Sequence, residues 1–106
     1  MNDKILTLLG FATKAGKLSY GFDAVKTALA QSKSKLVLIA NDLSQKSQKE
    51  VVFFADKFKT KVLVLQSYDM EPISHAVGRK CGIISVNDSS FADGVLSAIN
   101  FREELK

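Results

Sequence analysis

The spacing of apolar residues along the chain alternates between a helix pattern and a strand pattern. Four strands are predicted at 17–20, 36–40, 62–65 and 83–86, the second and third of them buried on both faces. Five segments between and around them repeat apolar residues every three or four positions, as one buried helix face does. Their stripes are Ile5, Leu8, Leu9 and Ala12; Phe22, Val25, Ala28 and Leu29; Val51, Phe54, Ala55 and Phe58, widened by Val52 and Phe53; Ile73, Ala76 and Val77; and Phe91, Val95, Ala98 and Ile99. The alternation predicts one layered α/β domain over residues 1–106, with helices on both sheet faces.

Capping and turn residues mark the ends of these predicted helices. Gly16 and Gly78 are placed to end the first and fourth helices, and Gly21 opens the second, predicted over 22–32. The residues that signal a helix start are Asn2 or Asp3, Ser47 with Glu50 as a capping box, Pro72 in a first turn, and Ser90 with Asp93 as a second capping box. We expect residues 101–106 to fray.

The composition is sufficient for a hydrophobic core and has an excess of basic residues. The 106 residues are 46% hydrophobic, which is enough for one compact core, and they carry a net charge of +4. Small basic proteins often bind polyanions, but 13 of the 15 basic residues are lysine, so bidentate arginine contacts are scarce. The run Lys57, Lys59 and Lys61 is interpreted as a solvated face.

Several classes of function are not supported by the residues. No run of 18 apolar residues and no signal-peptide layout occur, so we expect no membrane association. The single cysteine, Cys81, cannot form an internal disulfide, which favours the cytoplasm. His75 and Cys81 do not make a metal cluster, and no phosphate-binding glycine motif is present. The sequence therefore predicts no enzyme, no metal and no cofactor.

Three segments, 21–29, 33–42 and 75–79, resemble the kink-turn-binding ribosomal protein family, most closely its small bacterial paralogues. The likeness runs from about Leu6 to Ile99. It implies a three-layer α/β/α sandwich around a four-stranded mixed sheet. It also implies a non-catalytic RNA-binding protein that recognises an RNA helix–internal loop–helix bent at tandem sheared G·A pairs. The partners implied are ribosomal or kink-turn-like RNA and ribosomal proteins, with no DNA specificity.

In the family, the start of the second helix enters the RNA major groove with the pattern Gly-x-Asn-Glu-x-x-Lys. Gly21 matches here, whereas Asp23, Ala24 and Thr27 replace the three polar positions, and Lys26 stands one residue early, about 100° around the helix. Two polar contacts to guanine edges are therefore lost unless Lys26 reaches across. The RNA-binding residues predicted around this helix are Lys17, Gly21, Phe22, Asp23, Lys26 and Thr27.

General properties of helix starts and of glycine also make this position a favourable RNA contact, independently of the resemblance. A helix N-terminus attracts phosphate, and a glycine lets the backbone approach a ligand closely. Lys14, Lys17, Lys26 and Lys33 are near this point in sequence and are expected to contact flanking phosphates.

The turn after the fourth helix is the second predicted contact. It corresponds to the family's hydrophobic loop that holds an extruded base, but here it contains Arg79 and Lys80 before Cys81. Arg79 could stack on a base or pair with a phosphate. We expect this turn and Gly21 to converge into one cationic surface.

Each of these residues also has a structural interpretation. Gly21 fits a plain turn glycine, Asp23 a first-turn acid paired with Lys26, and Cys81 a small buried apolar group. His75 fits a surface histidine.

The polar pair Asn41 and Asp42 follows the strand 36–40, at the kind of strand end where α/β sheets place their sites. We interpret the pair as loop builders that shape the site without touching RNA. For the whole chain, the alternative is a protein–protein adaptor of the ribosome or translation apparatus on the same fold.

Overall fold

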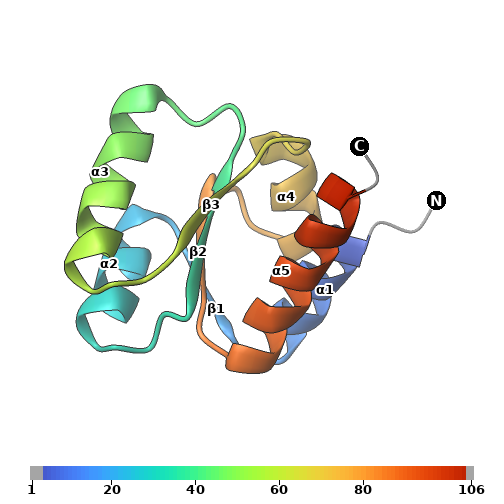
Figure 1. Cartoon of the computed structure of the whole chain (residues 1–106), viewed down its shortest axis with the longest axis horizontal. Helices are drawn as coiled ribbons and strands as arrows, with labels where there is room; N and C mark the ends of the chain where they lie inside the picture. The colour runs from blue at the N-terminus through green and yellow to red at the C-terminus, as the bar shows by residue number, and fades with distance from the viewer. Residues whose placement is uncertain (1–3, 105–106) are drawn as a thin grey trace.

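Helices and strands alternate along the whole of the described chain, as the apolar pattern predicted (Figure 1). The computed structural model describes the backbone of residues 4–104 and the side chains of residues 4–99. The elements are α1 (Lys4–Lys14), β1 (Leu18–Tyr20), α2 (Phe22–Ala30), β2 (Leu36–Ala40), α3 (Gln45–Lys57), β3 (Val62–Leu65), α4 (Met70–Val77), β4 (Ile83–Val86) and α5 (Ser89–Glu104). The predicted caps Asn2 and Asp3 lie outside the described residues.

The strands form one mixed sheet in the order β1-β4-β2-β3. β4 is antiparallel to both β1 and β2, and β2 is parallel to β3. In the register, Leu38 of β2 lies opposite Ile84 of β4 and Leu63 of β3. Because β1, β2 and β3 therefore run in one direction, their C-terminal ends meet at one edge of the sheet, together with the start of β4.

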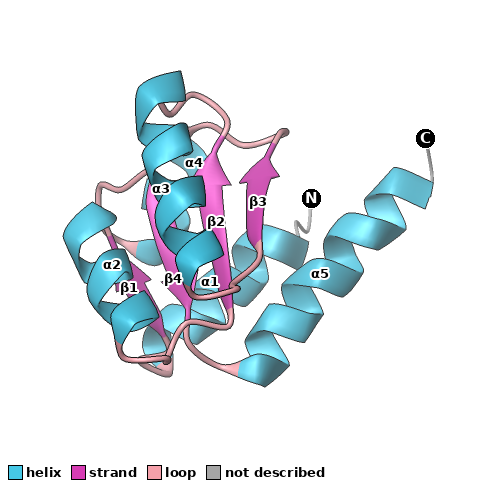
Figure 2. Ribbon diagram, turned by 60° about the vertical axis from the view of Figure 1, so that its left-hand side comes forward, coloured by secondary structure: helices cyan, strands magenta, loops and turns pink. Residues whose placement is uncertain are grey.

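Helices cover both faces of this sheet, with α2 and α3 on one side and α1, α4 and α5 on the other (Figures 1 and 2). The central strand β2 is buried throughout. Leu36 and Leu38 belong to the core cluster under α1, α4 and α5, whereas Val37 and Ile39 belong to the cluster under α2 and α3. The structure is thus the three-layer α/β/α sandwich with a four-stranded mixed sheet that the resemblance implied.

Both predicted capping boxes are wrong. The helix α3 begins at Gln45, and its cap is Ser44, whose Oγ accepts a hydrogen bond from the Ser47 amide at 3.2 Å. In α5 the Asp88 carboxylate accepts from the Phe91 amide at 3.0 Å, so the cap precedes Ser90. Each helix starts with polar residues, which an apolar stripe cannot detect.

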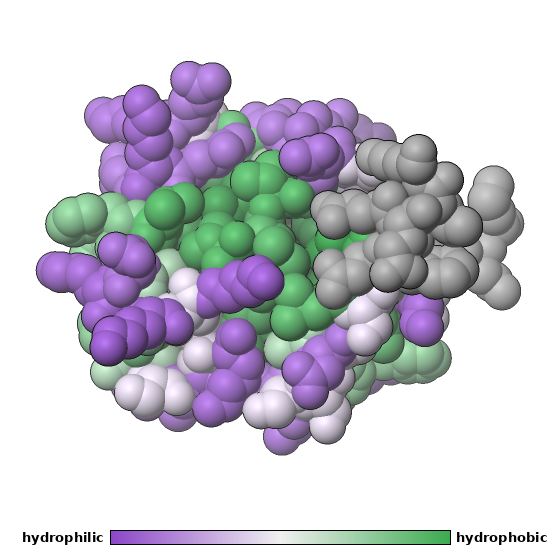
Figure 3. All heavy atoms as spheres, in the orientation of Figure 1, coloured by the Kyte–Doolittle hydropathy of each residue, from purple (hydrophilic) through white to green (hydrophobic). Residues whose placement is uncertain are grey.

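The burial of two segments also differs from the prediction. Val52 and Phe53 do not widen the buried face of α3, since their side chains are 48% and 64% exposed. Neighbouring helix residues lie about 100° apart, so a run of four apolar residues cannot all face the core. The strand β3 is buried only at Leu65, because it forms an edge of the sheet. A hydrophobic area is accordingly visible at the centre of the face seen in Figure 3.

The last helix reaches into the segment that was expected to fray. α5 continues to Glu104, and residues 105–106 lie outside the described part. At the other helix ends, the predicted glycines Gly16 and Gly78 adopt the left-handed conformation, with φ of 69° and 75°.

Candidate nucleic-acid interface

Four loops meet at the edge of the sheet where β1, β2 and β3 end. Main-chain hydrogen bonds hold them together: the Gly21 amide donates to the Ile83 carbonyl at 2.9 Å, and the Asn41 amide donates to the Tyr68 carbonyl at 2.8 Å. We call the surface formed by Gly21 and residues 41–42, 66–69 and 78–82 the loop edge. It contains both segments that the sequence predicted to converge.

The start of α2 is open to a ligand. Gly21 is its N-cap, with φ of 86°, and no side chain of the described residues caps the helix. No described atom lies within 4 Å of the position that a Cβ of Gly21 would take. The glycine is therefore needed for its dihedral angle rather than for space. The uncapped first-turn amides of α2 are available to an anion or to a base edge.

The side chains predicted on α2 divide into exposed and packed ones. Asp23 is exposed in the first turn, and its carbonyl accepts from the Thr27 hydroxyl at 3.1 Å. Phe22 is half-buried, with its ring edge-on to Phe54 at 6.2 Å. The Lys26 ammonium group lies 5.2 Å from the Phe22 ring centre and 4.4 Å from that of Phe54. Phe22 and Lys26 therefore pack toward α3, and Asp23 faces solvent.

The turn after α4 contacts the residue before Gly21. The centre of the Arg79 guanidinium lies 4.9 Å from the centre of the Tyr20 ring, a cation–π geometry. The Tyr20 hydroxyl in turn donates to the Thr13 hydroxyl at 3.0 Å. Lys80 is exposed beside Arg79. The basic turn and the start of α2 thus lie side by side.

Cys81 ends this turn inside the core. Its side chain is only 6% exposed, and burial raises the pKa of the thiol, with the Arg79 charge lowering it to a smaller extent. The Ser74 hydroxyl lies 3.0 Å from the Cys81 amide and 3.2 Å from its carbonyl. This anchor turns the thiol inward. The structure therefore agrees with the interpretation of Cys81 as a small buried group, and its predicted contact with RNA stays a prediction.

An open cleft of about 800 Å³ runs between α4 and the β2–α3 loop. Its lining combines the basic residues Arg79 and Lys80 with the acidic residues Asp42 and Glu71, and it also includes His75. Asp42 also caps α4, since its carboxylate accepts from the Met70 amide at 2.9 Å. Its neighbour Asn41 donates to the Asp69 carboxylate at 3.4 Å. Asn41 and Asp42 therefore build the loop edge, in agreement with the interpretation from sequence.

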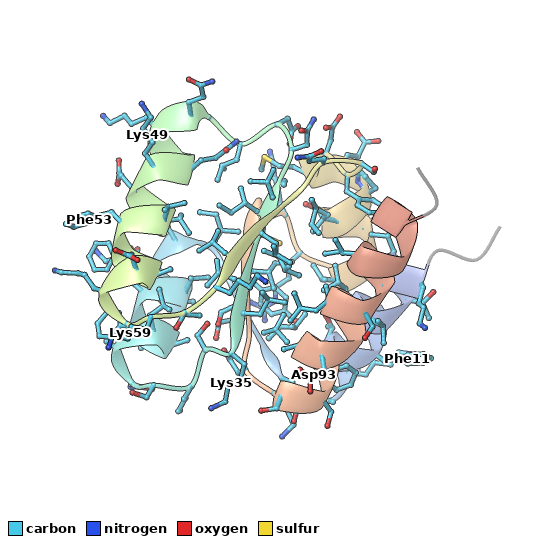
Figure 4. All side chains as sticks on the ribbon, in the orientation of Figure 1. Phe11, Lys35, Lys49, Phe53, Lys59 and Asp93 are labelled. Carbon is cyan, nitrogen blue, oxygen red and sulfur yellow. The ribbon has the colours of Figure 1, made fainter. Side chains whose placement is uncertain are left out.

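Lys17 lies at the opposite edge of the sheet. Its carbonyl accepts from the Asn87 amide at 2.8 Å, where β4 ends, and the Lys35 amide pairs with Val86 at the same end. Figure 4 shows Lys35 at the bottom of the molecule, whereas α3 and α4 begin at the top. β1 separates Lys17 from Gly21. Lys33 follows α2, whose length separates it from the loop edge. The structure brings neither lysine to the loop edge.

Two residues that support the loop edge from the neighbouring elements were missed from the sequence. Tyr20 positions Arg79, and Ser74 anchors the turn before β4. The signal for Tyr20 was its place directly before Gly21 at the end of a strand. Ser74 carried no local signal, because its partner is seven residues away.

Residues 3–94 match the sequence model of the ribosomal protein L7Ae/L30e/S12e/Gadd45 family. The chain belongs to this family. Large ribosomal subunit protein eL30 of Candida glabrata is 33% identical over 93 residues, covering 86% of this chain and 87% of that protein. RNA-binding protein YlxQ of Bacillus subtilis is 27% identical over 94 residues, covering 88% and 92%. The resemblance stated from sequence is confirmed, and it is to a family of ribosomal and RNA-binding proteins rather than of enzymes.

Solved structures share the fold. A Bacillus halodurans protein of unknown function superposes with a TM-score of 0.86 at 24% identity, covering 93% of this chain and 99% of that one. The Giardia lamblia 15.5kD RNA binding protein gives a TM-score of 0.70 at 14% identity, covering 100% and 93%. None of the helices in residues 4–104 is long and apolar enough to span a bilayer. Nor do the described residues hold a group of three His, Cys, Asp or Glu that could bind a metal.

Proposed function

We propose that this protein binds structured RNA at the loop edge, recognising a kinked helix–internal loop–helix through the start of α2 and the turn after α4. The contact between Arg79 and Tyr20 carries the proposal, because it joins these two segments into one surface. The names of the relatives, a ribosomal protein and an RNA-binding protein, support the same ligand class.

The chemistry of the loop edge suits a bend in RNA better than a regular duplex. The major groove of A-form RNA is too narrow for side chains, so proteins read RNA at bends, bulges and loops. Gly21 and the uncapped amides of α2 can approach such a groove closely. The exposed Asp23 carboxylate repels phosphate but can accept hydrogen bonds from base amino groups. Arg79 and Lys80 supply charge for the backbone of the flanking helix.

Replacing Arg79 and Lys80 together by alanine should weaken RNA binding about tenfold or more, because both cations lie beside the α2 start. The slope of log affinity against log salt should also fall by about 0.7 to 0.9 for each phosphate that the protein no longer neutralises. Gel shifts with a kink-turn hairpin, and with the same hairpin mutated at its sheared pairs, measure both effects.

The double variant Lys33→Ala and Lys35→Ala is the matched control. It removes the same charge from exposed lysines at the opposite edge of the sheet and should bind the hairpin with nearly unchanged affinity. Equal affinity for the kinked hairpin and an unkinked duplex would refute recognition of the kink. A protein partner that stays bound after RNase treatment, with no RNA binding by the purified chain, would favour the adaptor alternative.

A further inference from the structure

The outer side of α3 combines most of the net charge with exposed aromatic rings. Residues 45–61, which form α3 and the turn after it, contain five lysines against Glu50 and Asp56, and so hold three of the four net positive charges of the chain. Phe53 is 64% exposed and Phe58 is 41% exposed. The sequence pattern suggested a solvated lysine face, which does not account for two exposed phenyl rings among the lysines.

Along α3, the exposed residues Lys49, Phe53 and Lys57 recur every four positions. They form a row about 12 Å long, with the ring midway between the two cations. Figure 4 shows Phe53 and Lys49 pointing away from the body of the molecule on the same side of α3. We call Lys49, Phe53, Lys57 and Lys59 the α3 face.

The Phe53 ring is held in place by its neighbours. The Lys57 ammonium group lies 5.5 Å from the centre of the Phe53 ring and 5.4 Å from that of Phe54. The Phe53 and Phe54 rings meet edge to face, with centroids 6.4 Å apart. Phe54 in turn packs against Phe22, the first residue of α2. The exposed ring is therefore oriented before any ligand arrives, and its cluster reaches the α2 start at the loop edge.

The turn after α3 keeps a cation at a position that favours glycine. Lys59 has a left-handed backbone with φ of 55°, and its amide donates to the Asp56 carbonyl at 3.1 Å. A side chain strains this conformation, and a glycine would adopt it without strain. A lysine thus occupies a position that the backbone would favour for glycine, next to the other cations of the α3 face.

Single-stranded RNA fits this surface better than a protein does. Lysine is depleted from protein–protein interfaces, whereas lysines beside exposed aromatic rings are the usual surface for single-stranded nucleic acid. Bases stack on the rings, and the backbone phosphates contact the cations. A second copy of this chain would bring two faces of like charge together.

We propose that the α3 face is a second RNA-contact surface, which binds a single-stranded segment flanking the structured element. This inference rests on the proposed function, which places the structured element at the loop edge. The cluster of Phe22, Phe54 and Phe53 supplies the path from the loop edge to the α3 face.

Fluorescence anisotropy with three RNAs tests it: a kink-turn hairpin, the same hairpin with a single-stranded oligouridine tail of about eight nucleotides on either end, and oligouridine alone. The tail should tighten binding of the wild-type protein about tenfold, and Phe53→Ala should remove that gain without changing the affinity for the tailless hairpin. Phe11→Ala is the matched control, because Phe11 is 57% exposed on α1 in the other helical layer (Figure 4). It should keep the gain.

The outcomes separate the two proposals. The inference is overturned if the hairpin binds but a tail on either end gives no gain in affinity. It is also overturned if Phe53→Ala leaves that gain unchanged. Either result leaves the proposed function intact. Failure to bind the hairpin, with oligouridine bound through Phe53, refutes the proposed function and supports the RNA chemistry of the α3 face. An equal loss for the tailed and tailless hairpins also overturns the inference, because Phe53 would then act on the loop edge. Thermal melting of each variant shows that the fold is retained.

Discussion

The two helical layers end their helices with the same backbone turn but with different residues. In the layer of α1, α4 and α5, the left-handed positions are Gly16 and Gly78. In the layer of α2 and α3, they are Ser32, with φ of 59°, and Lys59, with φ of 55°. The hydrogen bonds correspond closely: Gly16 bonds to the carbonyl three residues before it, and so does Lys59. The backbone therefore requires only a positive φ, and glycine would suit every one of these turns.

The difference shows where local stability and surface chemistry compete. A side chain in the left-handed region costs about 1–2 kcal/mol relative to an unstrained backbone. The α1, α4 and α5 layer avoids this cost at both of its left-handed turns, and it covers the larger core cluster. Among the described residues that cluster has 17 buried members, against seven beneath α2 and α3. The smaller layer accepts the strain and carries the lysines and the phenyl ring of the α3 face.

Truncating neighbouring residues of β2 compares the two cores directly and should give the largest effect. Leu38 and Ile39 are 1% and 0% exposed and point into opposite clusters. Leu38→Ala should lower the free energy of unfolding by about 4 kcal/mol, because three helices hold its cavity open. Ile39→Ala should lower it by about 3 kcal/mol, because two helices with solvent behind them can close in further. Urea unfolding followed by circular dichroism measures both losses.

The comparison depends on which of the two substitutions, Leu38→Ala or Ile39→Ala, gives the larger loss of stability. A larger loss for Ile39→Ala would show that the α2 and α3 layer is packed more rigidly than its smaller cluster indicates. The conservative change Ile39→Val, expected to lower the free energy of unfolding by about 1 kcal/mol, checks that the loss follows the volume removed.

Substituting the left-handed residues Gly16 and Lys59 should change the free energy of unfolding in opposite directions, by less than the β2 truncations do. Gly16→Ala should lower the free energy of unfolding by about 1–2 kcal/mol, through backbone strain alone, since no described atom lies within 4 Å of the new Cβ. Lys59→Gly should raise it by about 0.5–1 kcal/mol, because relief of strain exceeds the added entropy of the unfolded chain. Denaturant melts give both values.

Lys49→Gly, within the regular part of α3, is the control for glycine itself and should lower the free energy of unfolding by about 1 kcal/mol. A destabilising Lys59→Gly change would mean that the lysine side chain stabilises the fold. The strain would then not be evidence for a role on the α3 face.

The fold could be predicted because the periods of helix and strand are local properties of the chain. The bounds of β2 follow from an uninterrupted apolar run and those of β4 from a run interrupted only by Ser85, and Gly16 and Gly78 mark the ends of their helices. Burial of β3 could not be predicted, because strand order is a property of the whole sheet and β3 lies at an edge. The four apolar residues Val62–Leu65 would have the same local pattern in a central strand as in an edge strand.

The candidate site shows the same limit. The convergence of Gly21 with the turn after α4 could be expected, because parallel strands end at one edge and loops gather there. Lys17 was misplaced because closeness in sequence does not ensure closeness in space. Lys17 precedes β1 and Gly21 follows it, so the two residues lie at opposite ends of that strand. For Cys81 the sequence left both an RNA contact and a small buried group open, and the contact of its amide with the Ser74 hydroxyl, seven residues away, could not be read from the local pattern. Contacts between separate elements decide such details.

The buried thiol gives the smallest expected effect and marks a further difference between the turns. The turn after α4 ends in Cys81, whereas the turn after α3 contains no ionisable group that faces the core. Burial raises the pKa of the Cys81 thiol above its ordinary value of 9.0 in the folded protein. The unfolded chain therefore loses this proton first. The contribution of the neutral thiol to stability is complete below pH 9 and declines as the pH rises from there through the folded-state pKa.

Cys81→Ala removes that titration and leaves the other groups in place. The difference in unfolding free energy between the wild-type protein and Cys81→Ala should be constant below pH 9 and should shrink above it, because only the wild type has a thiol that ionises more readily when unfolded. Urea melts of both proteins at a series of pH values measure this difference, and subtraction cancels the titration of lysines and tyrosines. A difference that grows as the pH rises toward 9 and is level above it would mean that the folded thiolate is stabilised, with the Arg79 charge outweighing burial. The turn after α4 would then hold its cysteine as a charged group next to the loop edge rather than as part of the larger core.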